Sequence, residues 1–334
     1  MEAPATAAPL KRLVGPHLQL GGGLLKAADR AREIGATTVQ VFSDNPTAWR
    51  RRTSLPPELP AFRDRLAEHG ITALSVHAPY LVNLCGPDPA FWERSVVTAI
   101  NELRVGRAYG ADFVNFHIGS HRGVGRDEGL RQLARGLRRV FEEAPDDRAA
   151  ARAGETAAAP LPRLVLENSP GSGDGIGATI EDLADIVDVT AAEGAPAERL
   201  FFCLDTAHLW SAGYPLDEPG GIDRLVGRVD ELLGRERVVM IHLNDAQTVR
   251  GSRVDRHQHI GAGRIGQPAL RELLSQPWLA TLPTYLETPA MDRGYDAINL
   301  ARVRQLLAGE DLVELPADAF EPRGSRSRNA APGD

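Results

Sequence analysis

The chain has 334 residues, 43% of them hydrophobic, which is enough to bury one large core. Its formal net charge of −7 argues against a protein that binds nucleic acid through a generally basic surface. Cys85 and Cys203 are the only cysteines, which excludes a disulfide framework and a cysteine-rich metal motif. The N-terminus lacks a secretory signal pattern and no apolar run reaches the length of a membrane span, so we expect a cytoplasmic protein without a membrane partner.

Alternating strand and helix patterns fill the chain between two polar ends. Short apolar runs predict strands at 16–20 and 37–42, and six further strands that end at His77, His117, Glu167, Asp205, His242 and Glu287. Apolar residues at helical spacing predict helices at 24–35, 58–69, 90–110, 127–143, 178–188, 222–234, 267–275 and 297–307. We expect residues 1–14 to be a flexible tail, residues 145–160 a helix extension or mobile connector, and residues 310–334 a C-terminal extension that is disordered at least from residue 323.

Eight strand–helix repeats, with no separate block of helices or strands, predict an α/β fold with a parallel sheet. Eight repeats in one domain of residues 15–309 predict that the sheet closes into a single (β/α)₈ TIM barrel. The carboxyl ends of barrel strands meet at one face, where barrel enzymes hold their active sites. Because six consecutive predicted strands end in a histidine or a carboxylate, we expect a metal cluster at that face.

The segment at 242–263 carries a further carboxylate and histidine, Asp255 and His257, two residues apart in a loop. Zinc prefers imidazole and carboxylate ligands, and this Asp-x-His pair can hold one ion from the same side. Taken alone, the segment is equally consistent with a solvated charged loop. His208 lies three residues after Asp205 and can face the same pocket. Together with the six strand ends these make nine candidate ligands, which suit a cluster of two or three ions better than a single ion.

Several segments of the chain resemble, in order, signatures of endonuclease IV, the zinc-dependent apurinic/apyrimidinic endonuclease of the xylose isomerase-like TIM barrel superfamily. They are SVHAPYLVNL, NFHIGSH, LVLENSPGSGDGIG, CLDTAHLWSAGY, HLNDAQTVRGSRVDRHQHIGAGRIG and YLET, and the similarity covers about residues 15–307. The resemblance implies a DNA repair endonuclease that hydrolyses the phosphodiester bond 5′ to an abasic site in duplex DNA, leaving 3′-hydroxyl and 5′-deoxyribose phosphate ends. A bacterial-type, nucleoid-associated location and a monomeric state are expected.

The resemblance implies a three-metal mechanism with about three zinc ions per chain, and manganese is an alternative in some sites. The implied ligand groups are His77, His117 and Glu167; Glu167, Asp205, His242 and Glu287; and His208, Asp255 and His257. Glu167 would bridge the first two ions, and Glu167 and Glu287 are expected to be the catalytic carboxylates. Three divalent ions would add about six positive charges beside the substrate phosphate, so a net charge of −7 does not exclude DNA as the partner.

Further site residues are expected around these ligands. The expected DNA contacts are Tyr80, Trp49 and Arg256, and the residues expected to orient metal ligands are His259, Asn244 and Asp245. For the latter three, ordinary loop hydrogen bonding is the alternative. After the second predicted strand, family members often read Asn-Gln-Arg-x-Trp, whereas this chain has Asn45-Pro46-Thr47-Ala48-Trp49. Two polar side chains that help to penetrate DNA are therefore missing, so intact chemistry is expected while abasic-site recognition stays open.

Two other functions compete with this interpretation. A sugar isomerase or epimerase of the xylose isomerase-like barrel type would need only one metal set, which Glu167, Asp205, His242 and Glu287 would satisfy. The additional histidine and carboxylate set argues against it, because an isomerase has no need of a third metal. A metal-bound nucleic-acid-binding or scaffolding protein without activity would be favoured by broken ligand positions, and all nine are filled.

Overall fold

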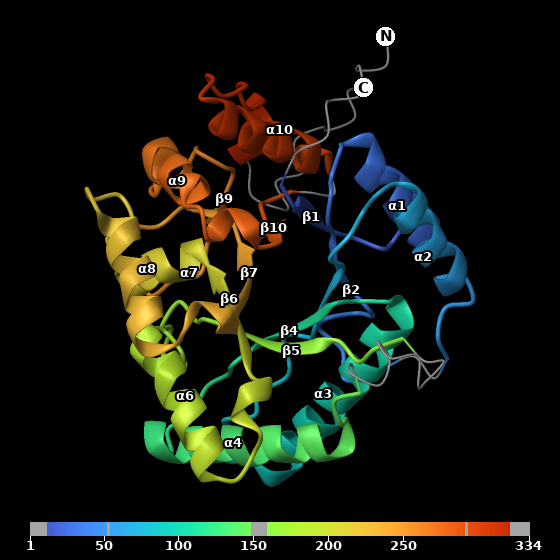
Figure 1. Cartoon of the computed structure of the whole chain (residues 1–334), viewed down its shortest axis with the longest axis vertical. Helices are drawn as coiled ribbons and strands as arrows, with labels where there is room; N and C mark the ends of the chain where they lie inside the picture. Colours follow the sequence, from blue (N-terminus) through green and yellow to red (C-terminus); the bar gives the residue numbers. More distant parts are fainter. Residues whose placement is uncertain (1–11, 52–53, 148–158, 291–292, 321–334) are drawn as a thin grey trace, which may run out of the picture.

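Eight parallel strands close into a barrel surrounded by helices in a computed structural model, which describes residues 12–51, 54–147, 159–290 and 293–320 (Figure 1). The strands are ordered β1-β10-β7-β6-β5-β4-β3-β2 around the ring. Consecutive barrel strands are therefore neighbours in space, and β1 pairs with β10 to close the ring. This arrangement confirms the predicted α/β fold with a single (β/α)₈ TIM barrel.

The barrel strands are short and lie close to their predicted positions. They are β1 (Val14–Leu18), β2 (Gln40–Phe42), β3 (Ser75–His77), β4 (Phe113–His117), β5 (Arg163–Glu167), β6 (Phe201–Asp205), β7 (Val238–His242) and β10 (Thr284–Leu286). β1 starts before residue 16, and Val14 pairs with Thr284, so the barrel begins one residue inside the predicted N-terminal tail. An antiparallel ribbon that was not predicted, β8 (Asp245–Ala246) and β9 (His257–Gln258), follows β7.

Helices cover the outside of the barrel, and the short α7 follows the end of β6 directly (Figure 1). They are α1 (Leu24–Glu33), α2 (Leu59–Glu68), α3 (Pro89–Tyr109), α4 (Arg126–Glu143), α6 (Ile180–Ala192), α7 (Thr206–Ala212), α8 (Gly221–Leu232), α9 (Gly266–Ser275) and α10 (Tyr295–Ala308). Side-chain caps start three of them: Asp88 accepts from the Phe91 amide at α3, Thr179 and Asp182 form a capping box at α6, and Asp205 accepts from the His208 amide at α7. α7 was not predicted, and most of the connector predicted at 145–160 lies outside the described residues.

The barrel interior is built in layers, because side chains two residues apart in a strand point to the same side. One layer is apolar and contains Phe113, Val165, Cys203, Met240 and Tyr285. Two residues further along the same stretches of chain, the sequence has Asn115, Glu167, Asp205, His242 and Glu287. The alternation therefore places a polar layer, with four of the predicted metal ligands, at the carboxyl end of the barrel.

Residues 310–320 follow α10 and end in a short 3₁₀ turn, η5 (Ala317–Phe320). Ala319 in this turn is buried, and the Tyr295 hydroxyl of α10 donates a hydrogen bond of 2.6 Å to Asp318. The first part of the predicted C-terminal extension is therefore packed against the barrel, whereas residues 321–334 lie outside the described residues.

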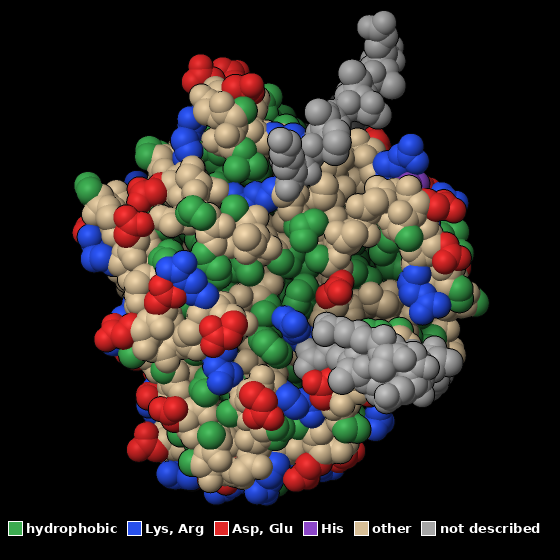
Figure 2. All heavy atoms as spheres, in the orientation of Figure 1, with side chains coloured by type: hydrophobic (Ala, Val, Ile, Leu, Met, Phe, Trp, Pro, Cys, Tyr) green, Lys and Arg blue, Asp and Glu red, His purple; other side chains and the backbone are tan. Residues whose placement is uncertain are grey.

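Acidic and basic side chains intermingle over the face drawn in Figure 2, without a patch of one sign. Many charged side chains of the molecule are paired across neighbouring helices; Arg126 of α4, for example, contacts Asp182 and Asp185 of α6. Exposed pairs of this kind contribute little to stability individually. Across the described ranges, no helix is both long enough and apolar enough to cross a membrane.

Candidate metal centre

Three groups of histidines and carboxylates meet at the carboxyl end of the barrel. The strand register places His117 beside Glu167 and Asp205 beside His242, so ligands from neighbouring strands start side by side. Within each group, one potential ligand atom per residue lies within 4.8 Å of every other. The groups are His77, His117 and Glu167 (first); Glu167, Asp205, His242 and Glu287 (second); and Asp205, His208 and His257 (third). All six predicted strand-end residues are thus brought together.

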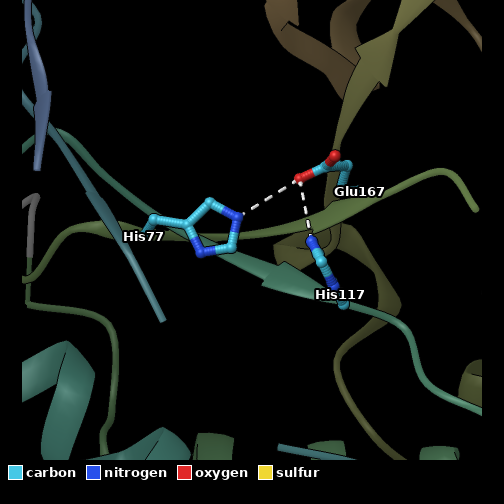
Figure 3. A group of neighbouring side chains, drawn as sticks. All are labelled: His77, His117 and Glu167. Atoms are coloured by element: carbon cyan, nitrogen blue, oxygen red, sulfur yellow. Dashed lines mark ion pairs between the residues drawn. The ribbon is translucent and has the colours of Figure 1, made fainter. Parts of the chain in front are cut away.

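Glu167 lies at the centre and turns its two carboxylate oxygens toward different histidines. Its Oε2 atom is 3.6 Å from His77 Nε2 and 3.8 Å from His117 Nε2, and both imidazoles point to it in Figure 3. Its Oε1 atom is 3.3 Å from His242 Nδ1. Asn115, on β4, donates a hydrogen bond of 2.5 Å to Oε2. Glu167 therefore lies between the first and second groups, which is the geometry that a bridging ligand needs.

Asp205 is shared by the second and third groups, which was not anticipated from the sequence. Its Oδ2 atom lies 3.8 Å from His242 Nδ1 and 3.6 Å from His257 Nε2. Its Oδ1 atom accepts a hydrogen bond of 2.8 Å from the His208 backbone amide and so caps α7. The cap holds His208 in the first turn of the helix, directly beside the ligands of the barrel. The spacing Asp-x-x-His in the sequence was the only signal of this arrangement.

Asp255 joins the third group from the loop between β8 and β9. Its Oδ2 atom is 3.3 Å from His208 Nε2, and its Oδ1 atom is 3.2 Å from His257 Nε2. The ribbon pairs Ala246 with His257, which returns the loop to the barrel and brings Asp255 over the pocket. All nine residues predicted as metal ligands therefore lie in one pocket.

Backbone carbonyls fix which nitrogen several of the imidazoles present to the pocket. The Nδ1 atoms of His77, His208 and His257 lie 2.7 Å, 2.8 Å and 3.0 Å from the carbonyl oxygens of Ala78, Asn168 and Glu287, respectively. A carbonyl can only accept a hydrogen bond, so Nδ1 carries a proton, and Nε2 is the nitrogen that each ring can offer to a metal ion. Such outer contacts are usual around metal-binding histidines, because they orient the ring and raise its basicity.

Several buried nitrogen and oxygen atoms in this pocket lack a hydrogen-bond partner, and a metal ion would give them one. Among the described residues, the buried atoms without a hydrogen-bond partner include Glu167 Oε1, His208 Nε2, His242 Nδ1 and His257 Nε2. Unpaired buried polar atoms are costly, and coordination of a cation removes that cost. Imidazole nitrogens and carboxylate oxygens that face one pocket are also the ligand set that zinc prefers.

The charges in the pocket support the same conclusion. Burial opposes protonation of His208 and His257, but the carboxylates Asp205 and Asp255 outweigh it. They raise the pKa of His208 well above its usual value and the pKa of His257 to about 9. Burial likewise opposes ionisation of Glu167, yet His242 and His208 hold the pKa of this carboxyl well below its usual range. The carboxylates thus stabilise positive charge in the pocket, which divalent cations would supply.

Gln40 on β2 contacts two of the predicted ligands and was missed in the sequence. Its Nε2 atom donates a hydrogen bond of 2.7 Å to Glu287 Oε1, and its Oε1 atom lies 3.2 Å from His242 Nε2. Because a carboxylate only accepts, the amide nitrogen must face Glu287, and the amide oxygen accepts from the His242 ring. His242 therefore presents Nδ1 to the pocket. Ser75 and His17 complete this network, with Ser75 Oγ 3.0 Å from the amide oxygen and His17 Nδ1 3.0 Å from Glu287 Oε1.

We expect Gln40→Ala to weaken zinc binding by about 10- to 100-fold, because Glu287 and His242 each lose a contact that orients them. Zinc affinity, measured by competition with a chromogenic chelator, checks this expectation independently of activity. Gln276→Ala is the matched control, because the Gln276 amide pairs with Asp223 at the surface, and it should leave zinc affinity unchanged. Wild-type zinc affinity in Gln40→Ala would contradict the positioning role.

Asn244 is one of the three residues expected to orient ligands, and it contacts two of them. Its Nδ2 atom donates a hydrogen bond of 2.7 Å to Asp205 Oδ2, and its Oδ1 atom accepts one of 2.8 Å from the Glu287 amide. For His259 the expectation is wrong, because its ring nitrogens lie 3.0 Å from Asn299 Nδ2 and 3.0 Å from the Ala319 carbonyl oxygen. β9 ends at residue 258, so the strand alternation that would keep the rings at 257 and 259 on one side does not continue.

Asp245 is buried and shapes a loop instead of orienting a ligand, which corrects the third expectation. Its carboxylate accepts hydrogen bonds of 2.8 Å, 2.9 Å and 2.9 Å from the amides of Ala246, Gly263 and Ile265. The chain approaches so closely that a Cβ atom at Gly263 would lie 2.4 Å from the Ala246 carbonyl oxygen. Asp245 therefore ties the end of the loop at 242–263 to its beginning.

We expect Asp245→Ala to lower the free energy of unfolding by about 3 kcal/mol, because several buried amides lose their acceptor. Asp245→Asn should cost less, since its amide oxygen can still accept. Urea unfolding measures both variants. Asp230→Ala is the control, because the exposed pair of Asp230 with Arg235 should contribute little to stability. Equal stability of Asp245→Ala and this control would contradict the structural role.

A cavity of about 1570 Å³ opens over the metal-ligand layer, and His117, His208 and Glu287 are among the residues that line it. Two of the expected DNA contacts, Tyr80 and Arg256, also line the cavity. Tyr80 is 53% exposed, and its ring centroid lies 5.7 Å from that of His117. An exposed aromatic ring and a guanidinium group thus stand beside the predicted metal ligands.

The loop after β2 borders the same cavity through residues 45–47. Arg51 anchors this loop, because it donates hydrogen bonds of 3.0 Å to the Asn45 carbonyl and 2.6 Å to the buried carboxylate of Glu102. Trp49, expected to contact DNA, is not among the lining residues, and its ring packs edge-on against Phe91 with centroids 5.0 Å apart. Trp49 therefore packs against α3, and residues 45–47 form this part of the cavity edge.

Comparisons with known proteins relate these features to a family. The family model described as xylose isomerase-like TIM barrel matches residues 28–308. The chain is 36% identical over 294 residues to the probable endonuclease 4 of Methanoculleus marisnigri, and the match covers 88% of this chain and 98% of that protein. It is 32% identical over 292 residues to the probable endonuclease 4 of Halothermothrix orenii, with 86% and 99% covered.

Solved structures agree with these relatives. The crystal structure of endonuclease IV from Thermus thermophilus superimposes with a TM-score of 0.73 at 32% identity, covering 89% of this chain and 99% of that one. A 3-keto-D-glucoside 4-epimerase from E. coli has a TM-score of 0.60 at 13% identity, with 88% of this chain and all of that one covered, and this likeness extends to the fold alone. The predicted resemblance is confirmed, and the chain belongs to the endonuclease 4 family of xylose isomerase-like TIM barrels.

Proposed function

We propose that this protein is a metal-dependent phosphodiesterase of DNA repair that hydrolyses the bond 5′ to an abasic site in duplex DNA, leaving 3′-hydroxyl and 5′-deoxyribose phosphate ends. The relatives named endonuclease 4 and the solved endonuclease IV support this class of enzyme. The observation that carries the proposal is the third group of ligands, in which His208, His257 and Asp205 lie together with Asp255 above them.

The ligand set divides among three ions in this proposal. Glu167 would bridge the first and second groups, and the third group would hold a further ion. We take zinc as the ion, because imidazole nitrogens and carboxylate oxygens in small buried groups suit zinc well. When bound, such ions supply Lewis-acid stabilisation of phosphoryl oxygens and make water a stronger nucleophile at neutral pH.

The protein's own part in the reaction is to hold the ligands still and in the right protonation state. Side-chain amides of Asn115, Gln40 and Asn244 donate hydrogen bonds of 2.5 Å, 2.7 Å and 2.7 Å to ligand carboxylates. These bonds keep the carboxylate oxygens oriented before substrate arrives, so the site needs little reorganisation during the reaction. The carbonyl contacts of the imidazoles direct their protons away from the pocket, which leaves the lone pairs for metal ions.

The size of the cavity favours a nucleic acid over a small sugar as substrate. Pockets for small molecules usually have volumes of about 300–1,000 Å³, whereas the cavity above the ligands has a volume of about 1570 Å³. Arg256 in its lining could contact a phosphate, and Tyr80 could stack on a base or a sugar. The damaged duplex would then lie across the carboxyl face of the barrel, with the scissile phosphate over Glu167. We expect the protein to act as a monomer.

Incision of a duplex that carries one tetrahydrofuran abasic analogue tests the proposed function. With zinc-loaded protein we expect a single nick on the 5′ side of the analogue, with a 3′-hydroxyl that a DNA polymerase can extend. The same duplex with a normal nucleotide at that position is the matched control and should stay whole. An intact abasic duplex, together with epimerisation of a ketose, would overturn the proposal in favour of a single-metal epimerase.

A further inference from the structure

We propose that residues 310–320 form an additional wall of the substrate cavity and that Phe320, at the end of this wall, stacks against DNA beside the abasic site. This inference rests on the proposed function. It concerns residues beyond position 308, where the match to the family model ends. The wall would therefore add a DNA contact to the barrel that the family shares.

Buried polar side chains hold the segment in place. The buried ring of His259 lies with Nε2 3.0 Å from the Ala319 carbonyl oxygen and Nδ1 3.0 Å from Asn299 Nδ2. Arg302, which is 5% exposed, donates a hydrogen bond to the Val313 carbonyl. A segment that only trailed from the barrel would not need two buried side chains to bind its carbonyl groups, because water would satisfy its backbone. The path of the chain up to residue 320 is thus specified by the barrel.

The end of the segment reaches the cavity that holds the predicted metal ligands. Ala319 and Phe320 line this cavity together with His257 and Glu287. Phe320 is 56% exposed, although its ring packs edge-on against His259 with centroids 6.1 Å apart. A large aromatic side chain that is held by a buried ring and is more than half exposed is suited to stack on a planar group.

The surroundings of Phe320 indicate that the planar group is a nucleobase. Arg256 and Arg293 line the same cavity, and Arg293 Nη1 lies 3.9 Å from Asp318 Oδ2 in the wall itself. Guanidinium groups bind phosphates of any sequence, and aromatic rings stack on any base. The loss of a base at the abasic site exposes the faces of its neighbours, so a fixed ring at the cavity edge has a partner there. Phe320 would thus contribute to binding and not to the chemical step.

Single-turnover incision of the tetrahydrofuran duplex at increasing protein concentration tests this role. We expect Phe320→Ala to raise the half-saturating concentration about 10-fold, as expected for the loss of one base–aromatic stack, with the maximal rate unchanged. Phe320→Tyr should restore binding to within about twofold, because it keeps the ring. Leu307→Ala is the matched control, since Leu307 is 40% exposed on α10 and is not among the residues that line the cavity.

The salt dependence of binding separates stacking from a charge effect. Because a phenyl ring contacts no phosphate, the slope of log affinity against log salt concentration should be the same in Phe320→Ala and in the wild type. A wild-type half-saturating concentration in Phe320→Ala, or a loss that Phe320→Tyr does not restore, would overturn the inference. A wild-type protein that leaves the abasic duplex whole would overturn the proposed function itself.

Discussion

Replacing Glu167 by glutamine is expected to slow incision of abasic DNA by at least about 10³-fold, equivalent to about 4 kcal/mol of transition-state stabilisation. The Oε2 atom of this carboxylate faces His77 and His117, and its Oε1 atom faces His242. Glutamine has nearly the same size, but one end of its side chain is an NH₂ group, which donates hydrogen bonds and does not bind a cation. The first and second groups would therefore lose the ligand that they share.

The fold should survive this change, because a neutral amide costs less to bury than a carboxylate. Asn115 can still donate a hydrogen bond to the remaining oxygen of the glutamine. Thermal unfolding of the metal-free variant at or above the wild-type temperature would show this. Glu128→Gln, on α4, is the matched control and should incise like the wild type. An unchanged single-turnover rate in Glu167→Gln would exclude the bridging role.

The second large effect is expected for Asp205→Asn, with a rate of incision lower by about 10²- to 10³-fold. Asp205 Oδ2 is 3.8 Å from His242 Nδ1 and 3.6 Å from His257 Nε2, so one oxygen serves two groups. Asparagine removes the negative charge that Asp205 contributes to the second and third ligand groups. The cap of α7 should persist, since asparagine caps helices about as well as aspartate. The rate loss would therefore report on the metal groups and not on the position of His208.

Asp88→Asn provides a matched control for this variant. Asp88 caps α3 by accepting a hydrogen bond of 2.8 Å from the Phe91 amide, the same arrangement that Asp205 makes at α7. It lies outside the ligand groups, so the substitution should leave incision unchanged. Equal rates for the two variants would mean that Asp205 acts only as a helix cap.

Much of the fold could be predicted because strand and helix patterns alternate regularly along the chain. The strand ends were predictable for the same reason: an apolar run that stops at His117 or Asp205 marks both the strand and its polar end. α7 was missed because it follows β6 without any break, and its cap residue is the last residue of the strand. Helical periodicity cannot be recognised in seven residues.

The histidine and carboxylate ligands of the site could be predicted from the sequence. The neutral amide side chains that hydrogen-bond to these ligands could not. Gln40 and Asn115 lie inside strands, and nothing in their local sequence indicates that they face a carboxylate from another strand. Such contacts depend on the register of the barrel, which brings residue 40 near residue 287. His259 was misplaced because it lies two residues after His257, which suggested that both rings face one pocket. The His259 ring instead contacts Asn299 and the Ala319 carbonyl group.

Metal analysis of the zinc-loaded protein tests the three-group centre most directly. The arrangement of Glu167 and Asp205 between three groups predicts about three zinc ions per chain after excess metal has been removed. That number would agree with the third group formed by Asp205, His208 and His257 together with Asp255. One zinc ion per chain would contradict the three-metal centre and would fit a single-metal sugar epimerase built on the second group alone.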